Sequence, residues 1–373
     1  MWFRARKTVP EDTKRLLIFL CKNGRGEESC REVKRIVSLG YDLSFVDEET
    51  ALTPLLLALD SESSDPEIAK ILFTFSENAW QRGRYGFTTL HGAAKSQEFI
   101  DILEFAIKRA ENINEPMGEE SSNTALGLAT MNLNERGIVL LLQNGASLKA
   151  GNGAAAAGWS LTGWNGELKY KAEFHKYLRV DHLLEKCLNR LIEGGLRIND
   201  SFEYLFSRSA MLDAVINTWN SRGNALLQED EAFQRKKLVL LLNNGANPNI
   251  SYAKGRDQKP CSGNALHICK WSEQIAVLLN HGADPYAVDA SGRTVLHSVI
   301  ESRDHNQHLE EAMSRSSFSM SRLERRYAEN VRVNSTASRS LMDSIKEAKP
   351  SYFITEADKR KKFTYLGSLL HNM

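Results

Sequence analysis

The stretch of sequence that decides the fold reads Asn264-Ala265-Leu266-His267, then Ile275-Ala276-Val277-Leu278-Leu279-Asn280, then His281-Gly282-Ala283-Asp284-Pro285. After a short polar segment, Asp289-Ala290-Ser291-Gly292, the opening returns as Thr294-Val295-Leu296-His297. A polar capping residue before an apolar run is a typical helix start, and a glycine after such a run is a typical helix end. The stretch therefore predicts two short helices and a turn, and the returning opening predicts that this unit is repeated.

Related openings occur upstream. They read Thr53-Pro54-Leu55-Leu56, Thr88-Thr89-Leu90-His91, Thr124-Ala125-Leu126-Gly127 and, in a weaker form, Ser209-Ala210-Met211-Leu212. The first three follow one another at intervals of about 35 residues, a period that is typical of helical repeat proteins. A second landmark agrees with the first, because a glycine follows an apolar helix at Gly40, Gly145, Gly195, Gly245 and Gly282. The repeat is therefore predicted to run along most of the chain.

With these openings, apolar second helices and the turn Gly282-Ala283-Asp284, the chain resembles the ankyrin-repeat family. The resemblance implies an all-α solenoid of about seven to eight helix pairs with β-hairpin or loop fingers. Helix physics points the same way, because a Thr, Ser or Asn can cap the first helix and Pro54 suits the first helical position. One pair cannot bury its apolar face alone, so neighbours must stack, and the small residues Ala93, Ala94, Ala129 and Ala214 let them approach closely.

The sequence also predicts where the array departs from regularity. We expect an array over residues 1–312, beginning with a divergent pair over 13–42 whose outer side is polar, as a cap requires. Repeats over about 150–260 are stretched, with two middle insertions at Ala150–Lys169 and Asn217–Arg235. Residues 313–373 lack the repeat and are rich in Ser, Lys and Arg, so a basic linker and a C-terminal helical tail are expected there.

Composition excludes several classes of protein. The 373 residues carry a formal net charge of +1, which does not indicate a surface dominated by one sign. The five cysteines are odd in number and scattered, unlike the pattern of a disulfide-stapled secreted domain. We see no secretory signal and no run of ~20 apolar residues that could span a membrane. These observations predict a cytoplasmic protein, located in the host cytoplasm if it is a bacterial effector.

None of the candidate chemical motifs predicts a catalytic, metal or cofactor site. The resemblance implies a structural role for His91, His267 and His297, which hydrogen-bond within and between neighbouring hairpins. Cys261, His267 and Cys269 lack the paired spacing of a zinc site. Gly151-Asn152-Gly153 lacks the lysine of a phosphate-binding loop. We therefore expect no catalytic residue, no metal and no cofactor.

The predicted partner-binding residues lie at the hairpin tips, where the resemblance places partner contacts together with the concave face of the first helices. One tip combines aromatic side chains with arginines, a composition that is enriched at interface hot spots. Others are acidic or basic, and alternating charge favours selective recognition of one patterned surface. The candidates are Trp80, Arg82, Arg84, Tyr85, Glu119, Glu120, Tyr252, Lys254, Arg256 and Lys259.

These observations predict a scaffold that binds a partner protein, without a small-molecule substrate. Its divergent repeats, insertions and basic end are similar in character to the ankyrin proteins that intracellular bacteria inject into host cells. One alternative is an effector enzyme with a small catalytic element in the insertions, for which His175, His182, Glu185 and Cys187 would have to meet in one pocket. Another is binding of the basic tail to an anionic membrane or nucleic acid, which would be strongly salt-dependent.

Overall fold

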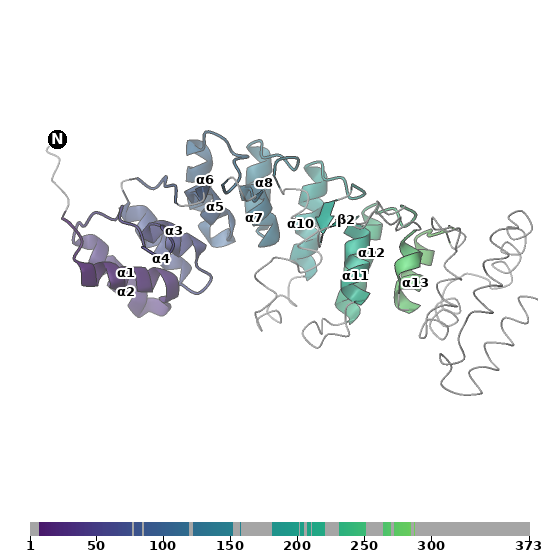
Figure 1. The fold of residues 1–373 in the computed structure, drawn as a ribbon, viewed down its shortest axis with the longest axis horizontal. Helices are drawn as coiled ribbons and strands as arrows, with labels where there is room; N and C mark the ends of the chain where they lie inside the picture. Colours follow the sequence, from purple (N-terminus) through teal and green to yellow (C-terminus); the bar gives the residue numbers. More distant parts are fainter. Residues whose placement is uncertain are drawn as a thin grey trace, which may run out of the picture. The chain divides into compact units, whose positions relative to one another are not determined.

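The computed structural model describes residues 7–76, 78–83, 86–118, 122–151, 157, 181–200, 202–204, 207–209, 211–220, 231–250, 264–269, 272–284 and 287. The chain divides into two compact units, Met1–Leu196 and Arg197–Met373. The described part of each unit is built from helices, with one short pair of strands in the second (Figure 1). The fold class is therefore all-α.

Helices in the first unit come in pairs. Its elements are α1 (Glu11–Asn23), α2 (Gly26–Ser38), α3 (Pro54–Asp60), α4 (Pro66–Phe75), α5 (Thr89–Ala94), the 3-10 turn η2 (Gln97–Phe99), α6 (Ile100–Arg109), α7 (Ala125–Met131), α8 (Glu135–Gln143) and α10 (Asp181–Glu193). The first helix of each pair packs on the first helix of the next pair, in the order α1, α3, α5 and α7. Second helices also pack on one another: α2 on α4, α6 on α8, and α8 on α10. Each pair thus lies beside the following pair (Figure 1).

The second unit repeats this arrangement. Its elements are β1 (Phe202–Tyr204), β2 (Ser207–Ser209), α11 (Met211–Asn220), α12 (Glu231–Asn243), the 3-10 helix η5 (Ala265–Ile268) and α13 (Ser272–Asn280). The two strands are antiparallel, and Glu203 pairs with Arg208. Helix α11 packs on α12 and on η5, and α12 packs on α13.

The helix starts are those that the openings predict. Thr53, Thr88 and Thr124 each accept a hydrogen bond from a backbone N–H at the start of α3, α5 and α7. Pro54 occupies the first turn of α3, as expected. Asn264 caps η5 in the same way, although this element is a 3-10 helix rather than an α-helix. The polar residue before each apolar run therefore ends the preceding loop and begins the helix.

The helix ends are also as predicted. Every glycine of the second landmark has a positive φ: +73° at Gly40, +90° at Gly145, +96° at Gly195, +87° at Gly245 and +83° at Gly282. Residues with a Cβ adopt this left-handed conformation only at a cost, so glycine ends these helices.

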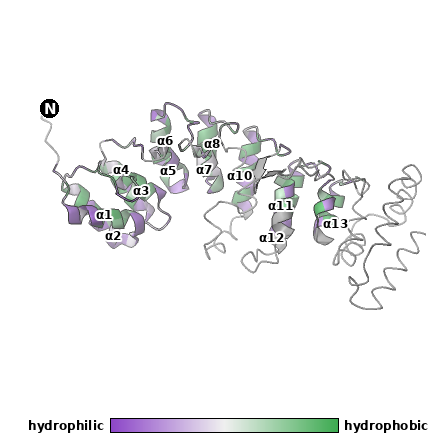
Figure 2. Ribbon diagram, in the orientation of Figure 1, coloured by the Kyte–Doolittle hydropathy of each residue, from purple (hydrophilic) through white to green (hydrophobic). Residues whose placement is uncertain are grey.

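The core lies between the pairs and consists of aliphatic and small side chains. In α5 every residue from Thr89 to Ala94 is buried, and so are Ala129 and Ala214 in their helices. A Cβ added to Gly92 would lie 2.7 Å from the Cβ of Leu59 in α3, so only glycine permits this approach. Figure 2 shows hydrophobic and hydrophilic segments within the same helices, as expected when one side of a helix is buried and the other is not.

Several expectations need correction or lie outside the described residues. The weak opening at residues 209–212 contains a strand end, because β2 runs to Ser209 and α11 begins at Met211. Part of the insertion over 217–235 belongs to α11 and α12, which lengthen this pair. Most of the first insertion and the whole of 313–373 are outside the described part of the chain. Among the described helices, none is long and apolar enough to cross a membrane.

The first pair is present but its outer side is not uniformly polar. The exposed outer residues of α2 include Glu27, Arg31 and Lys34, as a cap requires. On α1, however, Leu16 is 39% exposed and Phe19 is 59% exposed. The prediction of a polar cap is therefore wrong for α1.

Candidate partner-binding tips

The loop that carries Trp80 and Arg82 is a tight hairpin between two helix pairs. We refer to residues 78–83 with 86–88 as tip 2, to 110–118 as tip 3 and to 144–151 as tip 4. Within tip 2, Arg82 forms an antiparallel bridge with Thr88, and the N–H of Gly83 donates to the carbonyl of Phe87 at 2.7 Å. These bonds support the predicted hairpin fingers at this position.

Tip 2 is joined to the helix pair before it through Gln81. The side chain of Gln81 forms a hydrogen bond with the hydroxyl of Thr53, the residue that caps α3. Its own backbone N–H donates to the hydroxyl of Thr89 at 3.0 Å, and that hydroxyl donates to the carbonyl of Ala79 at 2.8 Å. Gln81 therefore ties tip 2 both to the cap of α3 and to the start of α5.

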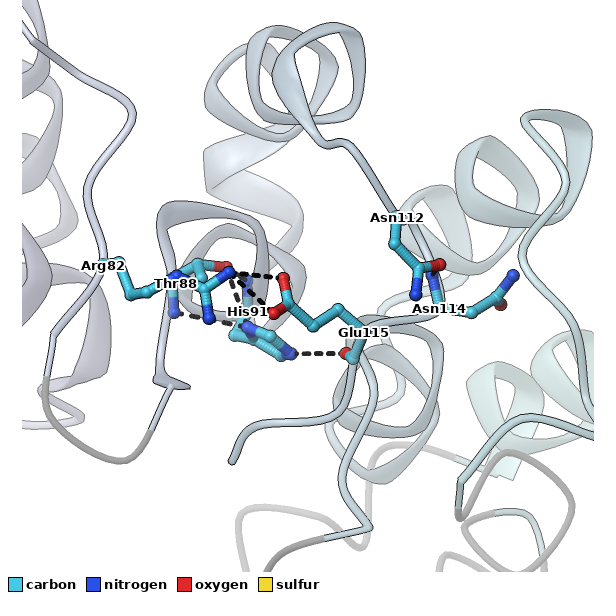
Figure 3. Close-up of polar contacts among 6 residues, drawn as sticks. All are labelled: Arg82, Thr88, His91, Asn112, Asn114 and Glu115. Atoms are coloured by element: carbon cyan, nitrogen blue, oxygen red, sulfur yellow. Dashed lines mark hydrogen bonds and ion pairs between the residues drawn. The ribbon is translucent and has the colours of Figure 1, made fainter. Parts of the chain in front are cut away.

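An ion pair joins tip 2 to tip 3. The guanidinium of Arg82 donates to both carboxylate oxygens of Glu115, at 2.6 and 2.7 Å (Figure 3). The side chain of Arg82 is 52% exposed and that of Glu115 is 30% exposed. A surface ion pair of this kind contributes about 0–1 kcal/mol to stability, so its main effect is to orient the arginine. Arg82 is thus exposed, as predicted, but is engaged by Glu115.

His91 lies beneath this ion pair and links the same two tips. Its Nε2 lies 3.0 Å from the carbonyl oxygen of Glu115, and its Nδ1 lies 3.3 Å from the backbone nitrogen and 2.8 Å from the hydroxyl of Thr88 (Figure 3). Burial lowers the pKa of His91 below its ordinary value, which favours the neutral ring. A neutral ring that donates from Nε2 and accepts at Nδ1 satisfies all of these partners. The predicted structural role of this histidine is confirmed.

A second link between neighbouring turns was missed by the sequence analysis. In the first unit, Asn114 accepts from the N–H of Ser147 at 2.7 Å and donates to the carbonyl of Gly145 at 3.4 Å. In the second unit, the same two-sided bond runs from Asn199 to the turn 245–247 and from Asn249 to the turn 282–284. Two of these asparagines follow the helix-ending glycine by four residues, a recurrence that the sequence does contain.

Most predicted partner-binding residues lie outside the described part of the chain. Of the candidates only Trp80 and Arg82 are described, and Trp80 is half-buried. The residues outside are Arg84, Tyr85, Glu119, Glu120, Tyr252, Lys254, Arg256 and Lys259. Exposure differs among the first helices: α3 exposes only Asp60 and α5 exposes none of its residues, whereas Leu16 and Phe19 of α1 are exposed.

The residues of the enzyme alternative do not converge where they are described. On α10, His182 and Glu185 are exposed whereas Cys187 is buried. Burial raises the pKa of Cys187 to about 12, so its thiol stays protonated at neutral pH and is a poor nucleophile. His175 lies outside the described residues.

The zinc alternative finds no support in the described residues either. Cys269, which follows η5, is buried, and its thiol donates to the carbonyl of Ala265 at 3.2 Å. Burial also raises the pKa of this thiol, which disfavours the thiolate that zinc requires. Cys261 is outside the described part, within which no cluster of metal-ligand side chains occurs.

The sequence matches none of the protein-family models and none of the curated proteins with which it was compared.

Proposed function

We propose that this chain is a divergent ankyrin-repeat scaffold that binds a partner protein through its tips. The repeat assignment rests on three features that recur: the threonine caps, the left-handed glycines and the bonds between successive turns. Each helix pair has apolar residues that only a neighbouring pair can cover, which is the packing logic of a solenoid. The resemblance to the ankyrin family is what suggests protein binding rather than chemistry.

The observation that carries the binding proposal is the double link between tips 2 and 3. The side chain of Glu115 holds the exposed Arg82, and its carbonyl is held by the buried His91. A loop that is already ordered loses less conformational entropy when a partner binds. Half-buried Trp80 beside an oriented arginine supplies two of the residue types that dominate interface energies.

The experiment is affinity capture from animal-cell cytosol with the intact chain and with single-site variants. Host cytosol is the first source to test because the chain is similar in character to injected bacterial ankyrin proteins. We expect Trp80→Ala and Arg82→Ala to lose captured partners, and a hot-spot loss of ~2 kcal/mol would weaken binding roughly 30-fold. For each captured protein the loss is measured by titration.

Lys70→Ala is the matched control. Lys70 lies on α4, is 42% exposed and forms an ion pair with Glu98 of the next helix pair at 3.9 Å, so it resembles Arg82 except for its position. Its substitution should leave the captured partners unchanged. If Trp80→Ala and Arg82→Ala also retain every partner at the wild-type affinity, the tip 2 site is wrong.

A further inference from the structure

Successive tips of the first unit are tied to one another by polar contacts. Tip 2 bonds through Gln81 to Thr53, the residue that follows the turn 40–52, which we call tip 1. Glu115 of tip 3 binds both Arg82 and His91. The side chain of Asn114 bonds to two backbone groups of tip 4. Tips 1–4 thus form one tied group.

Three later turns form a second tied group. We call residues 194–200 tip 5, residues 244–250 tip 6 and residues 281–284 tip 7. Asn199 of tip 5 bonds to the carbonyl and the N–H of residues 245 and 247 in tip 6, at 3.0 and 2.8 Å. Asn249 of tip 6 bonds in the same way to residues 282 and 284 in tip 7, at 2.8 and 2.6 Å.

No such tie joins the two groups. Every residue of tips 4 and 5 is described, and no hydrogen bond or ion pair runs from residues 144–151 to residues 194–200. The series of ties along the tips is therefore interrupted between tip 4 and tip 5.

The residue type at position 149 explains this interruption. Lys149 stands four residues after the helix-ending glycine of tip 4, the position that Asn199 and Asn249 hold in tips 5 and 6. The local turn is the same, because the N–H of Lys149 donates to the Ser147 hydroxyl at 3.2 Å, as that of Asn249 donates to the Asn247 side chain at 2.9 Å. An asparagine side chain carries both a donor and an acceptor, whereas a lysine only donates. Lys149 therefore cannot make the two-sided bond.

Other features of this joint allow movement at the tips. Helix α10 packs on α8, and Arg190 forms an ion pair with Glu135 at 3.6 Å, so the second helices stay in contact. Tip 5 begins with two glycines, Gly194 and Gly195, which adopt a wider range of backbone angles than other residues. The division between the two compact units falls after Leu196, within the same tip.

We propose that the joint between tips 4 and 5 is a hinge, at which the two tied groups of tips change their angle while α8 and α10 remain packed. Hinges in proteins are a few residues at the ends of elements that absorb a change in backbone angles, and Gly194 and Gly195 stand at such an end. A partner that contacts tips of both groups selects one angle. The hinge itself does not depend on the proposed binding function.

The test measures the distance between two nitroxide labels by pulsed electron paramagnetic resonance in the full chain. Lys108 of α6 and Arg235 of α12 are exposed and are changed to cysteine for labelling. Cys261 is changed to serine, and the four cysteines of the described residues are buried. A hinge gives a broad distribution of distances between these two labels.

Lys149→Asn should supply the missing tie. It should narrow the distribution between positions 108 and 235. It should also slow hydrogen exchange of the Arg197 amide, the counterpart in tip 5 of the tied amide of Asn247, about tenfold. Lys149→Ala, which supplies no acceptor, should change neither readout.

A label pair within the first group is the matched control. Arg31 of α2 is exposed, and labels at positions 31 and 108 should give a narrow distribution that Lys149→Asn leaves unchanged. The proposal is overturned if the wild-type distribution between positions 108 and 235 is as narrow as this control. It is overturned as well if Lys149→Asn protects the Arg197 amide without narrowing the distribution.

If Lys149→Asn does not protect this amide, the reciprocal variant decides. Asn114→Ala removes the tie between tips 3 and 4. It should therefore broaden the distribution between labels at Arg31 and at the exposed Arg136 of α8. An unchanged width would show that the asparagine ties do not fix the angle between neighbouring helix pairs, and the proposal would be wrong.

Discussion

Histidine is a common catalytic residue, but the burial and hydrogen bonds of His91 give it a structural role. The ring is buried and joins Thr88 of its own helix cap to the carbonyl of Glu115 in the next tip. Burial lowers its pKa, so the unfolded chain binds a proton more readily than the folded chain does. The contribution of this group to stability is complete above the unfolded pKa of ~6.5 and is lost as the pH falls below it.

We therefore expect the free energy of unfolding to decrease from about pH 7.5 to about pH 5.5, and to decrease less in a His91→Gln variant, which cannot be protonated. Urea unfolding followed by circular dichroism at both pH values measures the difference. Equal pH dependence of the two proteins would show that the pKa of His91 is the same in the folded and unfolded chains, so that burial does not lower it.

The role of His91 could be predicted, whereas that of Asn114 could not. The histidine sits inside a recurring opening, so its position in the unit was visible from the sequence alone. The partners of Asn114 are backbone groups of residues 145 and 147, and a backbone group leaves no signature in the sequence. Only the later recurrence at Asn199 and Asn249 marks this position.

Removal of the Asn114 side chain should separate tips 3 and 4. Asn114→Ala loses one bond to a backbone N–H and one to a carbonyl, so we expect a destabilisation of about 1–2 kcal/mol. Asn144→Ala is the control, since the side chain of Asn144 bonds only to the carbonyl of Leu140 in its own helix. Chemical denaturation should show the smaller loss for Asn144→Ala, and equal losses would contradict an inter-tip role.

At the scale of the helices, the close approach of α3 and α5 depends on Gly92, which has no side chain. The sequence predicts short first helices with small residues, and these are found. It does not tell which small residue touches which neighbour. Gly92 lies against the Cβ of Leu59, an atom that cannot move without its backbone.

A methyl group at this position should force the two helices apart. We expect Gly92→Ala to destabilise the first unit by roughly 1–3 kcal/mol, the usual cost of overpacking a core. In Gly194→Ala, by contrast, the added Cβ meets the end of the Leu142 side chain, at 2.8 and 3.0 Å, and that side chain can rotate away. Thermal or urea unfolding of both variants measures the contrast, and equal costs would mean that α3 and α5 are less tightly packed than described.

At the scale of the whole molecule, the sequence predicts the fold best where the openings are evenly spaced. The pairs α3–α4, α5–α6 and α7–α8 follow the three evenly spaced openings. The resemblance implied β-hairpin or loop fingers, but the positions of the strands β1 and β2 were not predicted, because three-residue strands carry too little periodicity to detect. The division at Leu196 was not anticipated either, since it depends on contacts between residues that are distant in sequence.

This division predicts how a local change spreads. If the helix pairs form the proposed repeat array, each pair contacts only its neighbours, and a destabilised pair affects adjacent pairs more than remote ones. We therefore expect Gly92→Ala to accelerate amide hydrogen exchange in α3, α5 and α7, and to leave α12 and α13 of the second unit nearly unchanged. Exchange followed by mass spectrometry resolves these helices in the intact chain. If α12 and α13 were accelerated as much as α5, the two units would unfold together as one cooperative body, which would contradict the expectation.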